Sequence, residues 1–118
     1  MYGNIDGHPL RVMLPKTLIF NVEGVEVLLT HIGGYPGKYA PGIIQQLRSN
    51  NTRLFISGHS HILKVMNDNT LKLLHINPGA AGIYGFHKVR TLIRFCIDNC
   101  RIYDLEVMEF ERGTLQEP

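Results

Sequence analysis

A strand–helix–strand segment between residues 25 and 57 is the feature that most constrains the fold of this chain. Residues 25–30 form a β-rich run, and Ile43, Ile44 and Leu47 follow at the spacing of one helical face. Residues 53–57 then form a short apolar run that is typical of a buried strand. Two strands joined through a helix form a parallel, right-handed crossover. The segment therefore predicts an α/β fold, and a length of 118 residues leaves room for one domain.

Turn signals group the remaining strands into hairpins. Three hairpins are expected: residues 18–22 with 25–30, residues 62–66 with 71–76, and residues 91–97 with 101–110. Their predicted turns are Glu23-Gly24, Asn67-Asp68-Asn69 and Asp98-Asn99. We therefore expect the first half of the chain to be α/β and the second half to be antiparallel.

Composition argues against several classes of protein. A net charge of +2, spread along the chain, is too weak to indicate a nucleic-acid-binding domain. No apolar run approaches the roughly 20 residues that span a membrane. Residues 1–6 contain no basic and apolar leader, and Cys96 and Cys100 are expected to stay reduced. Together these features favour a cytoplasmic protein.

Three polar clusters occur where predicted strands end: residues 3–6, 30–34 and 58–61. Because parallel strands end on the same side of a sheet, the second and third clusters bring His31, His59 and His61 together. Imidazoles with amide and carboxylate oxygens suit Zn, Fe, Mn or Ni. Taken singly, each cluster has a plainer interpretation, since a His-x-His pair is often solvated and Gly-Asn is usually a turn.

Four motifs occur in a fixed order: Gly3-Asn4-Ile5-Asp6, Thr30-His31, Gly58-His59-Ser60-His61 and Asn77-Pro78-Gly79-Ala80. In this order they resemble the motifs of calcineurin-like metallophosphoesterases, and most of all those of the small bacterial and archaeal phosphodiesterases. The resemblance implies a partial metallophosphoesterase α/β sandwich, in which mixed β-sheets are flanked by helices and the N-terminal strands are missing. It assigns residues 1–110 to the C-terminal part of such a domain and residues 111–118 to a polar tail.

The resemblance also implies a phosphatase or phosphodiesterase with two divalent metal ions (Mn, Ni, Fe or Zn). One ion would be held by Asn4, His31 and His59, and His61 would bind the other. Two such ions clamp a phosphate ester and lower the pKa of a bridging water, which attacks phosphorus. The catalytic candidates are His31 and Asp6, the latter to protonate or stabilise the leaving group. His8 is a weaker candidate for that role.

The sequence departs from the family pattern at its start. The family begins with an Asp-x-His strand and a Gly-Asp motif whose aspartate bridges the metals, and neither motif occurs before Gly3. Loss of a ligand or its support typically costs about 10–100-fold in metal affinity, so we expect weak metal binding and poor hydrolysis. Missing strands would also bare the edge of a parallel sheet, so we expect a homo-oligomer.

Other residues carry weaker predictions. Residues 85–90 form a basic, glycine-opened loop from which His87 and Arg90 are candidates to bind the phosphate-ester substrate, with a plain solvated loop as the alternative. Tyr35 and Tyr39 could stack on a base or sugar, or simply cover the helix. His75 lies in an apolar strand and is expected to be a structural histidine with satisfied hydrogen bonds.

Two other functions stay open. A retromer subunit with the same fold serves as a scaffold without chemistry, so a non-catalytic scaffold or protein-binding module is the main alternative. A mononuclear zinc domain would need Asp6 or His8 as a further ligand. Retention of the asparagine and the three motif histidines favours an enzyme ancestry.

Overall fold

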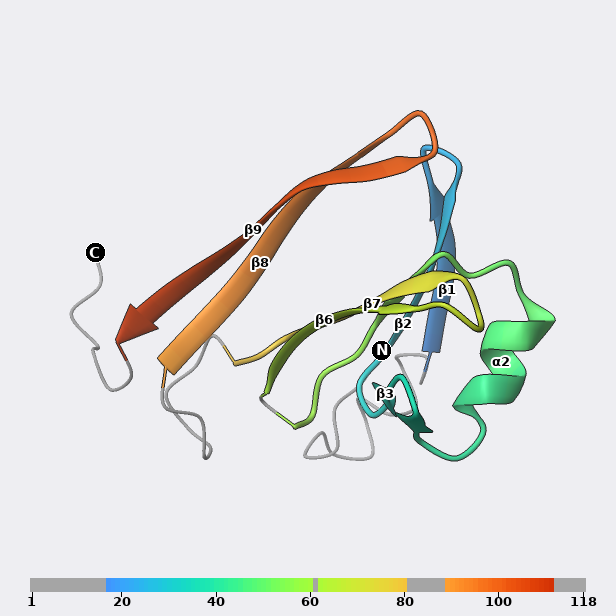
Figure 1. Ribbon diagram of the computed structural model, residues 1–118, viewed down its shortest axis with the longest axis horizontal. Coiled ribbons are helices and arrows are strands. Elements are labelled where there is room, and N and C mark those ends of the chain that lie inside the picture. The colour runs from blue at the N-terminus through green and yellow to red at the C-terminus, as the bar shows by residue number, and fades with distance from the viewer. Residues whose placement is uncertain (1–16, 61, 81–88, 112–118) are drawn as a thin grey trace, which may run out of the picture.

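A five-stranded mixed sheet forms the centre of the computed structural model, which describes residues 17–60, 62–80 and 89–111 (Figure 1). The strand order is β1-β2-β5-β7-β6. The bounds are β1 (Thr17–Val22), β2 (Val25–Thr30), β5 (Leu54–Ile56), β6 (Leu63–Asp68) and β7 (Leu73–Pro78). Two small sheets complete the strands: β3 (Gly34–Tyr35) with β4 (Lys38–Tyr39), and β8 (Val89–Asp98) with β9 (Arg101–Glu111).

The predicted parallel crossover is confirmed. Strands β2 and β5 pair in parallel, with Val27 opposite Leu54, and the connection between them contains α2 (Ile43–Ser49). The helix is short, and it buries Ile43 and Leu47 against the sheet. Burial of this apolar stripe, rather than helix propensity, stabilises so short a helix.

All three predicted hairpins are present, but the second belongs to the central sheet. Strand β6 pairs antiparallel with β7, and β7 also pairs in parallel with β5, so that Phe55 lies opposite His75. The expectation of a separate antiparallel half is therefore wrong at this point. The physical reason is that β7 is apolar on both faces, as Leu73 and Ile76 show, which suits an interior strand of a parallel sheet.

The third hairpin turns one residue later than expected. Asp98 pairs with Arg101, so the turn residues are Asn99 and Cys100, both with positive φ. Its tip lies against the β1–β2 turn, where the Cys100 N–H donates to the Glu23 carbonyl at 2.8 Å. Cys96 and Cys100 are both free and exposed, as expected.

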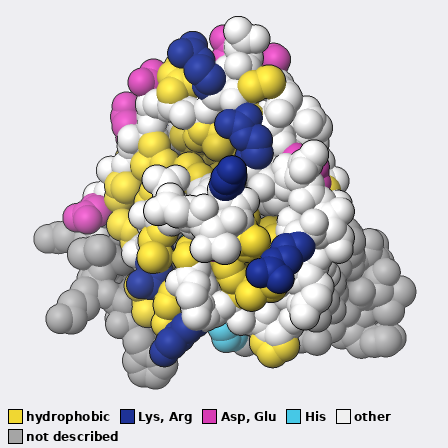
Figure 2. Space-filling view, turned by 45° about the vertical axis from the view of Figure 1, so that its right-hand side comes forward, with side chains coloured by type: hydrophobic (Ala, Val, Ile, Leu, Met, Phe, Trp, Pro, Cys, Tyr) yellow, Lys and Arg dark blue, Asp and Glu magenta, His cyan; other side chains and the backbone are white. Residues whose placement is uncertain are grey.

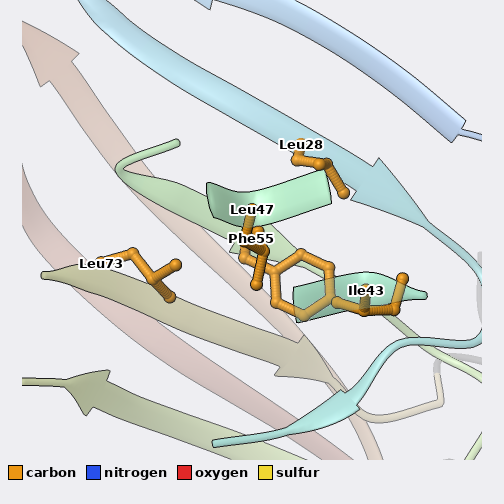
Figure 3. Packing of buried hydrophobic residues seen from close by; sticks show 5 residues of the cluster. All are labelled: Leu28, Ile43, Leu47, Phe55 and Leu73. Carbon is orange, nitrogen blue, oxygen red and sulfur yellow. The ribbon is translucent and has the colours of Figure 1, made fainter. Parts of the chain in front are cut away.

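Two apolar clusters fill the two faces of the central sheet. On one face, Ile43 and Leu47 of α2 pack on the sheet residues Leu28, Phe55 and Leu73, as Figure 3 shows. On the other face the long β8–β9 hairpin covers Val27, Leu54 and their neighbours. The structure is therefore layered as helix, sheet and hairpin, which confirms a partial α/β sandwich.

The edges of the central sheet differ from the expectation. Both edge strands, β1 and β6, are antiparallel to their neighbours, and the parallel strands β5 and β7 lie inside. Among the strands that the structure describes, no strand with a parallel neighbour lies at an edge of this sheet. Strand β1 nevertheless exposes Leu18, Ile19 and Phe20, with 37%, 47% and 42% of their surface accessible.

Two boundary observations complete the fold. Strand β9 extends to Glu111, and the rest of the predicted tail, residues 112–118, lies outside the described residues. Among the described helices, none has the length and apolar content needed to cross a bilayer.

Candidate metal centre

The candidate centre lies where β2 and β5 end. His31 follows the last residue of β2, and Gly58 and His59 follow β5 after Ser57. The Gly58 N–H donates to the His31 carbonyl at 2.8 Å, which ties the two strand ends together. The rings of His31 and His59 lie 5.2 Å apart between centroids, edge to face. The parallel strand order thus places these two predicted ligands side by side.

The ring spacing can be compared with that of a metal site. Two imidazoles that bind one ion through metal–nitrogen bonds of about 2.1 Å at a tetrahedral angle have ring centres about 5 Å apart. The separation of His31 and His59 fits a shared divalent ion, and it equally fits a simple edge-to-face pair.

The two imidazoles form an incomplete ligand set by themselves. Among residues 17–60, 62–80 and 89–111, no group of three His, Cys, Asp or Glu side chains is placed to hold an ion. A zinc-type centre needs at least three protein ligands. The other predicted ligands, Asn4 and His61, lie outside the described residues, as do Asp6, His8 and His87. Their assigned roles stay predictions.

His59 has a strained backbone. Its φ is 71°, in the left-handed region that side chains other than glycine rarely adopt. Its side chain is exposed, so packing of the imidazole does not explain the conformation. Strained residues of this kind gather at functional sites, where surrounding structure holds them in place.

Asn77 supplies much of that surrounding structure. Its amide Nδ2 donates to the Gly58 carbonyl and to Ser60 Oγ, both at 3.1 Å, and its Oδ1 accepts from the Gly79 N–H at 3.0 Å. Asn77 is almost fully buried. One side chain therefore connects the Asn-Pro-Gly motif to both residues that flank His59.

Close packing beneath the centre requires a glycine at position 33. A Cβ there would overlap the ring of Phe55 and the side chain of Ser57. The chain that follows His31 therefore lies directly on β5, and a larger residue would push the two strand ends apart.

Arg90 lies at the start of β8, near the Asn-Pro-Gly motif. The next residue, Thr91, donates from its N–H to the Ala80 carbonyl at 2.8 Å and from its hydroxyl to the Pro78 carbonyl at 2.7 Å. The Arg90 guanidinium lies 5.7 Å from the centre of the Phe110 ring. This contact gives Arg90 a packing role, and its predicted contact with substrate stays a prediction.

His75 is buried, as expected. Its hydrogen bonds, which we expected from the sequence to be satisfied, differ from that expectation. It has no accessible surface, and its ring packs against Phe55 with 5.1 Å between centroids. Neither ring nitrogen makes a hydrogen bond of standard geometry with a described residue. Burial lowers the pKa of His75, the charge of Lys64 lowers it further, and the Phe55 main chain partly opposes them. The neutral imidazole therefore has only a weak contact with the Phe55 main chain, and no hydrogen bond of standard geometry with a described residue.

Sequence reasoning missed Lys64. Its ammonium lies 4.8 Å from the centre of the Tyr35 ring, in a cation–π contact between β6 and the loop after His31. A lysine in an alternating edge strand carries no signal of such a role. Tyr39, by contrast, packs on Phe55 and donates to Asp68 at 2.6 Å, so it covers the core rather than facing the candidate centre.

Comparison with known proteins decides the family. Residues 1–99 match the family model described as the calcineurin-like phosphoesterase superfamily domain. The chain belongs to this superfamily. The resemblance to this superfamily is thereby confirmed, and superfamily membership carries an expectation of phosphoesterase chemistry with divalent metal ions. No match was found among curated protein sequences.

Solved structures of similar fold agree with the superfamily. A single mutant of Vps29 from Entamoeba histolytica is similar with a TM-score of 0.63 and 18% identity, over 92% of this chain and 67% of that protein. Wild-type Vps29 from the same organism, complexed with zinc, gives 0.59 and 16%, over 81% and 60%. An archaeal phosphodiesterase gives 0.56 and 17%, over 80% and 51%.

At these identities the similarity shows the fold alone. The chain spans between about half and two thirds of the length of these proteins. What each of them binds or does is therefore not carried over by the similarity itself.

Proposed function

We propose that this chain carries one part of the active site of a metal-dependent phosphoesterase. His31 and His59 bind one divalent ion together with Asn4, and His61 contributes to a second. Such ions would lower the pKa of a water for attack on the phosphorus of a phosphomonoester or phosphodiester. Asp6 assists the leaving group.

The placement of His31 beside His59 carries the proposal. Two separate strands deliver these imidazoles to one point, at the sheet edge where ligands bind in α/β folds. The match of residues 1–99 to the superfamily supports the same reading of the motifs. Asn77 and the strained His59 backbone hold the arrangement, which a purely structural loop would not require.

Metal binding tests the proposal most directly. We expect the chain to bind Mn²⁺ or Zn²⁺ weakly in isothermal titration, and the His59→Gln variant to bind at least about tenfold more weakly. The control is Arg48→Gln on the exposed side of α2, which should bind like the original chain. Equal metal affinity in all three proteins would refute the assignment of His59.

Hydrolysis of bis-p-nitrophenyl phosphate tests the chemistry. We expect slow turnover that rises with added Mn²⁺ and disappears in the His31→Gln variant. The activity should stay well below that of a full two-metal centre, because the sequence carries no Gly-Asp bridging motif. Turnover that is independent of both metal and His31 would contradict the proposal.

A non-catalytic scaffold is the second candidate. The exposed apolar residues of β1 favour it, since Leu18, Ile19 and Phe20 form an apolar edge that suits a partner protein. Fold similarity to Vps29 agrees with either candidate. The two differ in one respect: a scaffold needs the β1 edge and tolerates loss of His59, whereas the enzyme needs His59. A His59→Gln chain that keeps every measurable activity would favour the scaffold.

A further inference from the structure

A small cavity lies beside the candidate metal centre, between the loop after β2 and the β6–β7 hairpin. Its volume is about 190 Å³. Gly58, His59 and Ser60 form the side that it shares with the metal centre. Tyr35, Lys38, Lys64, His75 and Asn77 also line it, together with small and apolar residues of the loop after β2.

His75 is the first sign that the cavity binds a ligand. The imidazole is fully buried, forms part of the cavity wall, and makes no hydrogen bond of standard geometry with a described residue. A buried polar group without a partner costs about 1–3 kcal/mol, so natural folds rarely keep one unless water or a ligand satisfies it. The cavity is the space from which such a partner can reach the ring.

The charge of the wall is the second sign. Lys38 and Lys64 are the charged side chains in the described lining, and that lining includes no Asp or Glu. The cation–π contact with Tyr35 holds the Lys64 ammonium at the wall. From there its positive charge helps to lower the pKa of His75. On the face that Figure 2 shows, basic side chains lie over the centre and lower part with apolar side chains between them, whereas acidic side chains lie mainly towards the top and left. Two ammonium groups with no carboxylate beside them in the described lining disfavour a metal ion and favour an anion.

The volume limits the size of that anion. At about 30 Å³ for each water in the liquid, the cavity corresponds to about six water molecules. A phosphate group, with five non-hydrogen atoms, fits this space.

We propose that this cavity is a binding site for a tetrahedral oxyanion such as phosphate, held by the ammonium groups of Lys64 and Lys38 and by the N–H of His75. It adjoins the position where His31 and His59 would hold a metal, and His59 lies at both. The anion has two possible sources: free phosphate, or a second phosphate group on the ester that is cleaved. The second source rests on the proposed function, because it requires the scissile phosphate to lie at the metal centre.

Phosphate binding in the presence of a chelator tests the site without any metal. We expect inorganic phosphate to shift the NMR signals of His75 and Lys64, and the Lys64→Gln variant to bind about tenfold more weakly or worse. Lys72→Gln is the matched control, because Lys72 is exposed and lies outside the cavity, and it should bind phosphate like the original chain. Lys38→Gln provides a second exposed substitution that should weaken binding while leaving the core intact.

The outcomes separate this site from the metal centre. Shifts at His75 that Lys64→Gln abolishes support the site, even if the chain hydrolyses nothing. Absence of shifts at His75, or equal phosphate affinity in Lys64→Gln and Lys72→Gln, overturns it.

A comparison of esters then identifies the source of the anion. If an ester with two phosphate groups loses apparent affinity in Lys64→Gln while p-nitrophenyl phosphate does not, the anion is part of the substrate. If the two esters respond alike, the anion is free phosphate.

Discussion

Replacement of Asn77 by alanine tests the link between the Asn-Pro-Gly motif and the candidate metal centre. The buried amide makes three hydrogen bonds of 3.0–3.1 Å, to Gly58, Ser60 and Gly79. A neutral hydrogen bond contributes about 1 kcal/mol to folding. Because Ser60 is exposed and water can replace Asn77 there, we expect a loss of about 2–3 kcal/mol in the free energy of unfolding.

Urea denaturation followed by circular dichroism measures this loss. A destabilisation of about 2–3 kcal/mol corresponds to a fall of about 10 °C in Tm for a domain of this size. The control is Asn67→Ala, because Asn67 is exposed on β6, and it should stay within about 0.5 kcal/mol of the original chain. If Asn77→Ala lowers the free energy of unfolding no more than Asn67→Ala does, the hydrogen bonds of Asn77 do not stabilise the fold.

A second substitution separates the donor bonds from the acceptor bond. Asn77→Asp keeps an acceptor for the Gly79 N–H, but an ionised carboxylate cannot donate to the Gly58 carbonyl and repels it. We expect a loss comparable to that of Asn77→Ala at neutral pH, and a partial recovery on acidification, since a protonated carboxyl donates again. A loss that does not change with pH would contradict the assigned direction of this hydrogen bond.

Two further predictions concern the core and the sheet edge. Burial, helped by Asp68, raises the pKa of Tyr39, whose phenolate should therefore appear last in an alkaline ultraviolet titration. Burial alone would raise the pKa of Asp68, but the Tyr39 hydroxyl and two main-chain N–H donors lower it. Tyr39→Phe should therefore cost about 1 kcal/mol at neutral pH, and the difference should shrink below about pH 4 as the carboxyl becomes protonated; a pH-independent difference in urea unfolding would contradict this. We expect the chain to self-associate through β1, as measured by light scattering. Phe20→Lys on β1 should abolish this association, whereas the control Val107→Lys on β9 should retain it. An original chain that is monomeric would refute the prediction.

The sequence was sufficient for those parts of the fold that depend on local pattern. The crossover through α2 follows from the helical spacing of Ile43 and Leu47 between two β-rich runs, and each hairpin follows from a turn signal. The pairing of β7 with β5 was not predicted, because it joins residues 20 positions apart and no local pattern marks it. An apolar run of six residues is compatible with an edge or an interior position, and only the burial of both faces decides between them.

The residues of the candidate site also fall into those that a local sequence pattern predicted and those that it did not. His31 and His59 were found because each follows a strand, and the ends of parallel strands meet. The unsatisfied ring of His75 and the lysine on its neighbouring strand were not found, since burial without a hydrogen-bond partner has no sequence pattern. A histidine in an apolar strand looks the same in the sequence whether its nitrogens are satisfied or face a cavity.

The backbone of His59 offers a test that separates function from stability. A left-handed conformation costs a residue with a side chain about 1–2 kcal/mol, and glycine avoids this cost. Glycine also loses about 0.4–1 kcal/mol more through the entropy of the unfolded chain. Because the exposed imidazole contributes little packing, we expect His59→Gly to be more stable than His59→Ala, which keeps the strain, by about 0.5–1 kcal/mol.

Both variants remove the same imidazole, so both should lose metal affinity to the same extent. Urea unfolding and metal titration of this pair therefore measure the strain and the ligand separately. Equal stability of the two variants would show that the φ of 71° carries no strain. Unequal metal affinity would show that the backbone conformation itself, and not only the ring of His59, contributes to the centre. Greater stability of His59→Gly, together with equal loss of metal binding in both variants, would show that the chain keeps a strained backbone at the position where it needs the imidazole.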